Sequence, residues 1–192
     1  MKIAFINGSP RKNSGISAKL LHALEERLPG CEIVRGWGEP CDVYLFAFPL
    51  YVDGIPSNLL RELAEHETGL PPGARVYALV NNGFYEGGQN ATAIAMLRNW
   101  SARAGLSWKQ GAGIGGGPIL ESMSLPLGRG PLKNLGMALD TLAANILSGQ
   151  SGESVYTRPG LPRWGYMLGG DVSFRAAAKK NGLSRRDIKR RL

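Results

Sequence analysis

The 192-residue sequence lacks several features that would assign it to a class at once. It has two cysteines and two histidines, and Cys31 and Cys41 do not form a CxxC pair. No cluster of metal ligands is evident, and we expect no metal site. The longest apolar run, Val43–Leu50, is far shorter than the roughly 20 residues of a membrane-spanning helix. The apolar stretch after Met1 is too short for a signal peptide. We therefore expect a cytoplasmic protein with no membrane span and two buried thiols, a disulfide being the second possibility.

Two common nucleotide-binding signatures are also missing or incomplete. No GKS or GKT occurs, which excludes a Walker-type phosphate loop. The sequence GAGIGG at Gly111–Gly116 has GxGxxG spacing, but Pro118 follows at once and no further strand is evident downstream. We interpret these glycines as the end of a strand rather than a dinucleotide site.

Net positive charge is absent from most of the chain and concentrated at its end. Residues 1–156 contain 13 Lys or Arg and 13 Asp or Glu, so the net charge of +8 comes from residues 157–192. A neutral body argues against a nucleic-acid-binding domain, although the tail leaves nucleic acid or an anionic membrane as weaker possibilities. The sequence thus predicts a neutral domain with a cationic extension.

Apolar runs alternate with helical patterns along the first 150 residues. Runs typical of strands covered on both faces occupy residues 2–8, 31–36, 42–49, 75–83 and 106–115. Apolar residues at helical spacing occupy residues 18–28, 57–66, 91–104 and 131–149. This alternation predicts a parallel α/β domain over residues 1–150, followed by an extension over residues 151–192.

The connection after the first strand is unusually rich in polar groups. It reads SPRKNSGIS from Ser9 to Ser17. Hydroxyl and amide groups before the N-terminus of a helix are typical of a phosphate site. A simple Ser17 cap on a solvated loop is the alternative, but it leaves Ser9, Asn13 and Ser14 unexplained.

The connections after the third and fourth strands are also distinctive. In PLYVDGIPSNL, Tyr51 lies between two prolines, and a stiff loop of this kind suits packing beside a flat ligand. In NNGFYEGGQN, glycines allow close approach of the backbone, and Asn82 offers an amide. Taken singly, the first of these two loops is also consistent with a tyrosine that covers the core, and the second with a glycine-rich turn. Because parallel strands end at one edge, the three loops together predict a pocket for flavin mononucleotide (FMN).

The segments INGSPRKNSGISAKLL, FPLYVDGIPS and NNGFYEGGQN resemble those of the flavodoxin-like NAD(P)H-dependent FMN reductases and their quinone- and nitro-reducing relatives. The resemblance covers about residues 1–150 and implies a three-layer sandwich whose five-stranded parallel sheet has the order 2-1-3-4-5. It also implies non-covalent FMN that carries the chemistry, with no catalytic side chain. Hydride would pass from NADH or NADPH to a small acceptor, in a homodimer or homotetramer.

The resemblance also assigns roles to individual residues. Those expected to hold the FMN phosphate are Ser9, Arg11, Asn13, Ser14, Gly15 and Ser17. Those expected to flank the ribityl chain and ring are Pro49, Leu50, Tyr51 and Val52. Those expected to contact the isoalloxazine are Asn82, Gly83 and Phe84. The cysteine cluster of the iron–sulfur relatives is missing, so no such cluster is expected.

Two other functions stay open at this point. The second is a flavodoxin that carries single electrons between protein partners, although such carriers usually have acidic surfaces. A flavodoxin-like module that has lost its flavin and acts only in binding is the third possibility.

For the extension we predict an irregular segment followed by a helix that is capped by Asp171 and ended by Gly182, then a capping box at Ser184 and Asp187. We expect this part to pack on the domain through apolar side chains, namely Phe174, Leu183 and Ile188. A cover over a neighbouring subunit's flavin, or contacts to the NADPH phosphate, are the alternatives.

Overall fold

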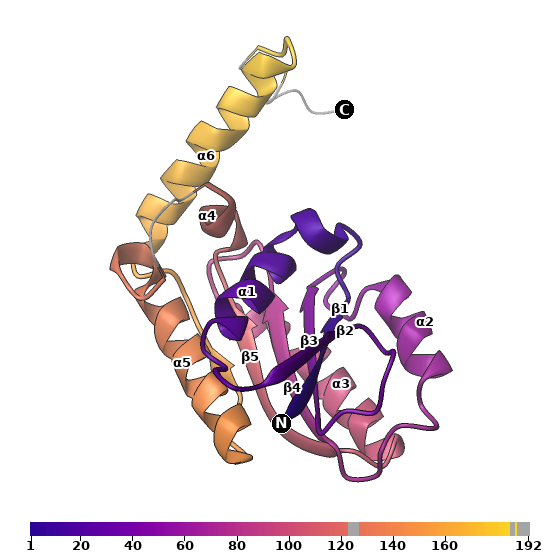
Figure 1. The fold of residues 1–192 in the computed structure, drawn as a ribbon. Helices are drawn as coiled ribbons and strands as arrows, with labels where there is room; N and C mark the ends of the chain where they lie inside the picture. The colour runs from indigo at the N-terminus through magenta and orange to yellow at the C-terminus, as the bar shows by residue number, and fades with distance from the viewer. Residues whose placement is uncertain (123–126, 185–186, 188–192) are drawn as a thin grey trace.

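The computed structural model describes residues 1–122, 127–184 and 187, arranged around one parallel sheet (Figure 1). The strands follow the order β2-β1-β3-β4-β5-β6. Their bounds are β1 Lys2–Asn7, β2 Glu32–Arg35, β3 Val43–Pro49, β4 Arg75–Asn81, β5 Ser107–Ile114 and β6 Val155–Tyr156. The predicted order of the first five strands is confirmed.

The prediction of five strands is wrong, because a sixth strand extends the sheet. Val155 pairs with Ala112 and Tyr156 with Gly113, both in parallel. A strand of two residues is too short to produce a recognisable apolar pattern, so no sequence signal predicts it. The extension after residue 150 therefore takes part in the sheet.

Helices cover both faces of the sheet, as predicted for a three-layer sandwich. The helices α1 (Ile16–Glu25) and α5 (Lys133–Ser148) lie on one face, and α2 (Ser57–Glu65) and α3 (Ala91–Arg103) lie on the other (Figure 1). Short helical segments lie in the connections, namely η1 Lys12–Ser14, η2 Gly87–Asn90, α4 Gly117–Ser122 and η3 Gly130–Leu132.

The side chains of β3 show why this sequence reads as a continuous apolar run. Val43, Leu45 and Ala47 belong to the core under α1 and α5. Tyr44 and Phe46 belong to the core under α2 and α3. Successive residues of a strand point to opposite faces, and here both faces are buried.

The last helix differs most from its prediction. The helix α6 (Arg163–Lys180) begins before Asp171, which lies in its interior and pairs with Arg175 at 3.3 Å. Phe174 is 75% exposed and Leu183 52% exposed, so the predicted packing through these two residues is wrong. The third residue of that prediction, Ile188, lies outside the described residues. Glycines inside α6 weaken the helical signal in the sequence, but they do not end the helix.

The end of α6 agrees with the prediction. Gly182 has a φ of 73°, and the Leu183 N–H donates to the carbonyl of Ala178. The Ser184 N–H donates to Asp187 Oδ2 at 2.8 Å, and the Asp187 N–H to Ser184 Oγ at 3.4 Å. These two bonds form the predicted capping box. The hydrogen bonds from Ser184 hold the pKa of Asp187 below its usual value. None of the described helices is long and apolar enough to cross a membrane.

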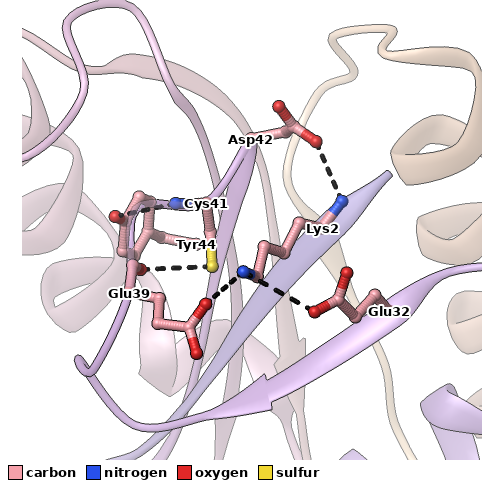
Figure 2. Close-up of polar contacts among 6 residues, drawn as sticks. All are labelled: Lys2, Glu32, Glu39, Cys41, Asp42 and Tyr44. Atoms are coloured by element: carbon pink, nitrogen blue, oxygen red, sulfur yellow. Dashed lines mark hydrogen bonds and ion pairs between the residues drawn. The ribbon is translucent and has the colours of Figure 1, made fainter.

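A charged cluster joins strands at the amino end of the sheet (Figure 2). Lys2 Nζ donates to Glu39 and lies 3.6 Å from Glu32 Oε1, while the Lys2 N–H donates to Asp42 Oδ2 at 2.8 Å. The bond to Glu39 raises the pKa of Lys2. Beside it, the Cys41 thiol is buried and burial raises its pKa. Both cysteines are free, and Cys31 is only partly buried.

These environments predict different reactivities for the two thiols. Iodoacetamide at mildly alkaline pH should label Cys31 roughly tenfold faster than Cys41, because the thiolate is the nucleophile and burial disfavours it. Peptide mass spectrometry over time would measure both rates. In denaturant the two rates should converge, and equal rates in the native protein would contradict the prediction.

Close backbone contacts fix β6 against η2. The Gly87 N–H donates to the Thr157 carbonyl at 2.7 Å, and the Thr157 N–H donates to the Gly113 carbonyl at 2.8 Å. A Cβ at Gly87 would lie 2.3 Å from the Gly113 oxygen and 2.4 Å from the Thr157 oxygen. At the neighbouring Gly88 a Cβ would meet nothing within 4 Å.

Gly87→Ala should therefore destabilise the protein, whereas Gly88→Ala should not. We expect Gly87→Ala to lower the free energy of unfolding by about 3 kcal/mol, because backbone atoms must move apart. The matched Gly88→Ala change should shift it by less than about 0.5 kcal/mol. Urea denaturation of both variants measures the difference, and similar losses in the two would contradict the close packing.

Candidate functional site

A cavity lies where the carboxyl ends of β1, β3 and β4 meet. Because β1 pairs with β2 on one side and β3 on the other, the chain reverses its direction across the sheet here. The cavity has a volume of about 230 Å³ and is open to solvent. Its lining comes from all three predicted loops.

Most of the predicted site residues line this cavity. They are Ser9, Arg11, Gly15, Ser17, Pro49, Leu50, Tyr51, Asn82 and Gly83. Three lining residues were not predicted, namely Ile16, Asn81 and Gly117. Four predicted residues do not line it, namely Asn13, Ser14, Val52 and Phe84. Arg11 is the only charged side chain among the described lining residues.

Hydrogen bonds within the first loop hold its shape. Asn7 Oδ1 accepts from the Ser9 N–H at 3.1 Å, and Asn7 Nδ2 donates to the Lys12 carbonyl at 2.8 Å. Ser9 Oγ accepts from the Arg11 N–H at 3.3 Å. Asn7 was not among the predicted site residues, although a polar residue at the end of an apolar strand was a usable signal. Because Ser14 is in η1, its side chain is exposed and bonds back to the Arg11 carbonyl at 3.1 Å.

The N-terminus of α1 points its amides toward the cavity without a side-chain cap. Gly15 is the residue before the helix, and no described side chain caps it. The first N–H groups of an α-helix have no partner within the helix. Gly15, Ile16 and Ser17 all line the cavity. The alternative in which Ser17 caps the helix is therefore wrong, and the free amides favour an anion.

Ser17 instead joins α1 to the end of β4. Its hydroxyl donates to Asn81 Oδ1 at 2.8 Å, and both residues are buried. A polar residue at the end of the apolar strand β4 was the signal for Asn81.

Removal of this bond should cost stability. We expect Ser17→Ala to lower the free energy of unfolding by about 1 kcal/mol, because Asn81 Oδ1 loses its donor in a buried position. Ser148→Ala is the matched control, since Ser148 is exposed at the end of α5 and its hydroxyl donates to the Ala144 carbonyl at 2.7 Å in a position open to solvent. Thermal and urea unfolding would measure both changes, and equal stability of the two variants would show that the bond contributes nothing.

The second loop makes a tight hairpin beside the cavity. The N–H groups of Tyr51 and Gly54 each donate to the other's carbonyl, at 3.3 and 3.0 Å. Between them, Val52 and Asp53 have φ values of 48° and 56°. A β-branched residue with positive φ is strained. Tyr51 lines the cavity and is 45% exposed, so it does not simply cover the core.

In the third loop, Asn82 is engaged with its own backbone. Its Oδ1 accepts from the Phe84 N–H at 2.9 Å, and its Nδ2 donates to the Glu86 carbonyl at 3.2 Å. The Gly117 N–H donates to the Asn82 carbonyl at 2.8 Å. The amide therefore shapes the loop, which leaves the backbone at Gly83 as the part that faces the cavity.

The start of α6 is hydrogen-bonded to the same loop, a contact that was not predicted from the sequence. Tyr166 Oη donates to the Gly83 carbonyl at 2.5 Å, and Arg163 pairs with Glu86 at 3.2 Å. Tyr85 Oη donates to the Leu161 carbonyl at 2.7 Å. Burial raises the pKa of Tyr166, which keeps its phenol protonated as a donor. The cluster of aromatic residues in LPRWGY was the available signal.

No protein-family model and no curated protein matches the chain. Among solved structures, a flavodoxin from Streptococcus pneumoniae TIGR4 aligns with a TM-score of 0.57 and 10% identity, over 78% of this chain and 99% of that one. An NAD(P)H:quinone oxidoreductase from Methanothermobacter marburgensis gives 0.55 and 14%, over 76% and 96%.

An FMN-dependent NADH-azoreductase from Bacillus anthracis, in complex with FMN, gives a TM-score of 0.52 and 14% identity, over 76% of this chain and 98% of that one. At such identities the likeness extends to the arrangement of strands and helices. Together with the strand order and the cavity at its reversal point, it shows that this chain has a flavodoxin-like fold.

Proposed function

We propose that the protein binds FMN non-covalently and passes hydride from NADH or NADPH to a small acceptor, such as a free flavin, a quinone or a nitro compound. The observation that carries the proposal is the cavity at the strand reversal, which combines uncapped amides of α1 with Arg11 and an exposed tyrosine. Two of the solved structures with this fold are reductases, one of them in complex with FMN.

The phosphate group fits the α1 end of the cavity. The amides of the first turn would donate to its oxygens, and Ser9, Ser17 and the Arg11 guanidinium lie around them. Glycine at position 15 lets the first loop pack closely on itself, because a Cβ there would lie 3.0 Å from Ser9 Oγ. Asn13 and Ser14 stay predicted phosphate contacts, but η1 places them outside the cavity.

The ring fits between the second and third loops. Tyr51 offers an aromatic face, and Pro49, Leu50 and Gly83 line the same cavity. FMN supplies the redox chemistry when bound, and the protein holds and orients it. Backbone amides of the third loop would stabilise negative charge at the end of the ring system. An open side leaves room for the nicotinamide and the acceptor in turn, which predicts ping-pong kinetics.

A role as a one-electron carrier is the alternative that the flavodoxin neighbour raises. Such carriers use acidic surfaces to steer partners. Over residues 1–156 the acidic and basic residues are equal in number, which favours the reductase.

Spectroscopy of the purified protein tests the proposal directly. We expect visible flavin bands, as isolated or after addition of FMN, that bleach when NADPH or NADH is added without oxygen. Bands that persist with both nicotinamides but bleach with dithionite would favour the carrier. Absence of bands and of FMN uptake would overturn the proposal and favour a flavin-free binding module.

Charge reversal at Arg11 tests where the phosphate binds. Arg11→Glu should weaken FMN binding at least roughly tenfold, because it removes a charge-assisted contact and places a carboxylate beside the phosphate. Arg98→Glu changes the net charge equally but lies exposed on α3, and should leave the dissociation constant unchanged. Fluorescence quenching of FMN measures both. Equal weakening in the two variants would place the phosphate elsewhere.

A further inference from the structure

The helix α6 extends away from the body of the molecule (Figure 1). None of its residues is buried. Trp164 is 73% and Phe174 75% exposed, and Met167, Leu168 and Val172 are each nearly 60% exposed. Large apolar side chains gathered on an exposed surface usually mark a binding partner. We call α6 the arm.

The arm is rooted at the edge of the cavity. Tyr166 bonds to the Gly83 carbonyl, and Arg163 pairs with Glu86 on the same loop. The rings of Tyr85 and Tyr166 lie 5.6 Å apart. These contacts fix where the arm leaves the body, so its apolar surface has a defined position relative to the cavity.

Apolar side chains on the loops that follow β3 and β4 are also uncovered. We call them the rim: Tyr51, which lines the cavity, Val52 and Phe84 are 45%, 102% and 56% exposed. Phe84 directly follows Gly83, to which the arm is bonded. Val52 holds a positive φ that favours Asn, Asp or Gly over a β-branched residue. Strain of this kind persists where the side chain has a role, and no intramolecular contact of Val52 explains it.

The distribution of charge on the arm favours a protein partner over a lipid surface. A helix that lies on a membrane segregates its apolar and charged residues on opposite faces. At about 100° per residue, Asp171 falls between Met167 and Trp164, and Arg175 falls between Trp164 and Leu168. Apolar and charged side chains thus share one side of the arm, as in protein interfaces with an apolar centre and polar surroundings.

We propose that two copies of the chain exchange arms, so that the arm of each copy lies across the rim of its partner and closes the open side of the partner's cavity. The arm and the rim both lie at the cavity edge, so a two-fold axis that places one arm on the partner's rim places the other arm equivalently. An 18-residue helix is about 27 Å long, enough to reach a neighbouring subunit.

The available area is sufficient for a stable pair. Burial of a tryptophan and a phenylalanine removes about 150–250 Å² each from solvent. About three quarters of each of these side chains is exposed, so two arms with two such anchors each contribute about 450–750 Å². The rim residues that they cover bring the total into the range of about 1,200–2,000 Å² that is typical of specific complexes.

Pairing of the two copies does not depend on FMN, whereas closure of the cavity over a ligand rests on the proposed function. The mass of the full chain in solution, measured without FMN by light scattering after gel filtration, tests the pairing alone. We expect twice the chain mass of 20.6 kDa. A monomer at all accessible concentrations would overturn the proposal, even if FMN binds. A dimer that takes up no FMN would support the pairing of the two copies and overturn the proposed function.

Two variants and a control locate the interface. Leu168→Asp with Phe174→Asp alters the arm, and Val52→Asp alters the rim; both should raise the dimer dissociation constant roughly 30-fold or more. Asp accepts a positive φ more readily than Val, so Val52→Asp keeps the turn. Leu147→Asp on α5 replaces an apolar residue that is 45% exposed away from both surfaces, and should stay dimeric.

A mixture of the two variants separates exchange from other modes of pairing. A mixed pair has one intact arm on one intact rim, so the mixture should dimerise more strongly than either variant alone. A dimer that survives Val52→Asp unchanged would overturn the proposal. Sedimentation of a monomeric wild-type chain with anionic phosphatidylserine vesicles would also overturn it, in favour of a membrane-bound tail.

Discussion

The parallel pairing of strands that are buried on both faces determines nearly everything else in this structure. Parallel strands require each connection to return over the sheet, so every loop that follows a strand leaves from the same edge. At β1 the order reverses, because β2 lies on one side and β3 on the other. Loops that are far apart in the sequence therefore meet at one cavity. The chemistry of the site follows from which residues this topology delivers to that edge.

The parts of the site that depend on this topology were predictable from the sequence. Continuous apolar runs identified β1, β3 and β4, and polar residues immediately after them identified the lining, as with Ser9, Tyr51 and Asn82. The local conformation of the loops was not predictable in the same way. The turn η1 directs Ser14 to solvent, and a left-handed conformation turns Val52 out of the cavity.

The extension was the least predictable part, for a related reason. The pairing of β6 and the bond from Tyr166 to Gly83 are contacts between residues far apart in the chain, and they leave no periodic pattern. Apolar side chains at Phe174 and Leu183 predict packing within the chain, yet both are exposed. An apolar pattern indicates that a surface packs against a partner. It does not show whether that partner belongs to the same chain or to a second one.

These long-range contacts change how the cavity should be understood. The loop that would face the ring is held from three sides: by the Asn82 side chain, by the N–H of Gly117, and by Tyr166 from the extension. A loop fixed by this many bonds holds its amides in place before any ligand arrives, and such preorganisation lowers the cost of binding. The extension is thus part of the support of the site as well as the segment through which we propose contact with a second copy.

The charge of the extension fits that arrangement. An arm with uncovered tryptophan and phenylalanine would aggregate if it carried no charge, because apolar surfaces associate without specificity. The excess of basic residues over residues 157–192 gives each chain a net positive charge, so chance contacts between arms are repelled. The rim belongs to a body that is neutral overall and offers no such repulsion. Like charge thus disfavours contact of one arm with another, and apolar contact favours an arm on a rim.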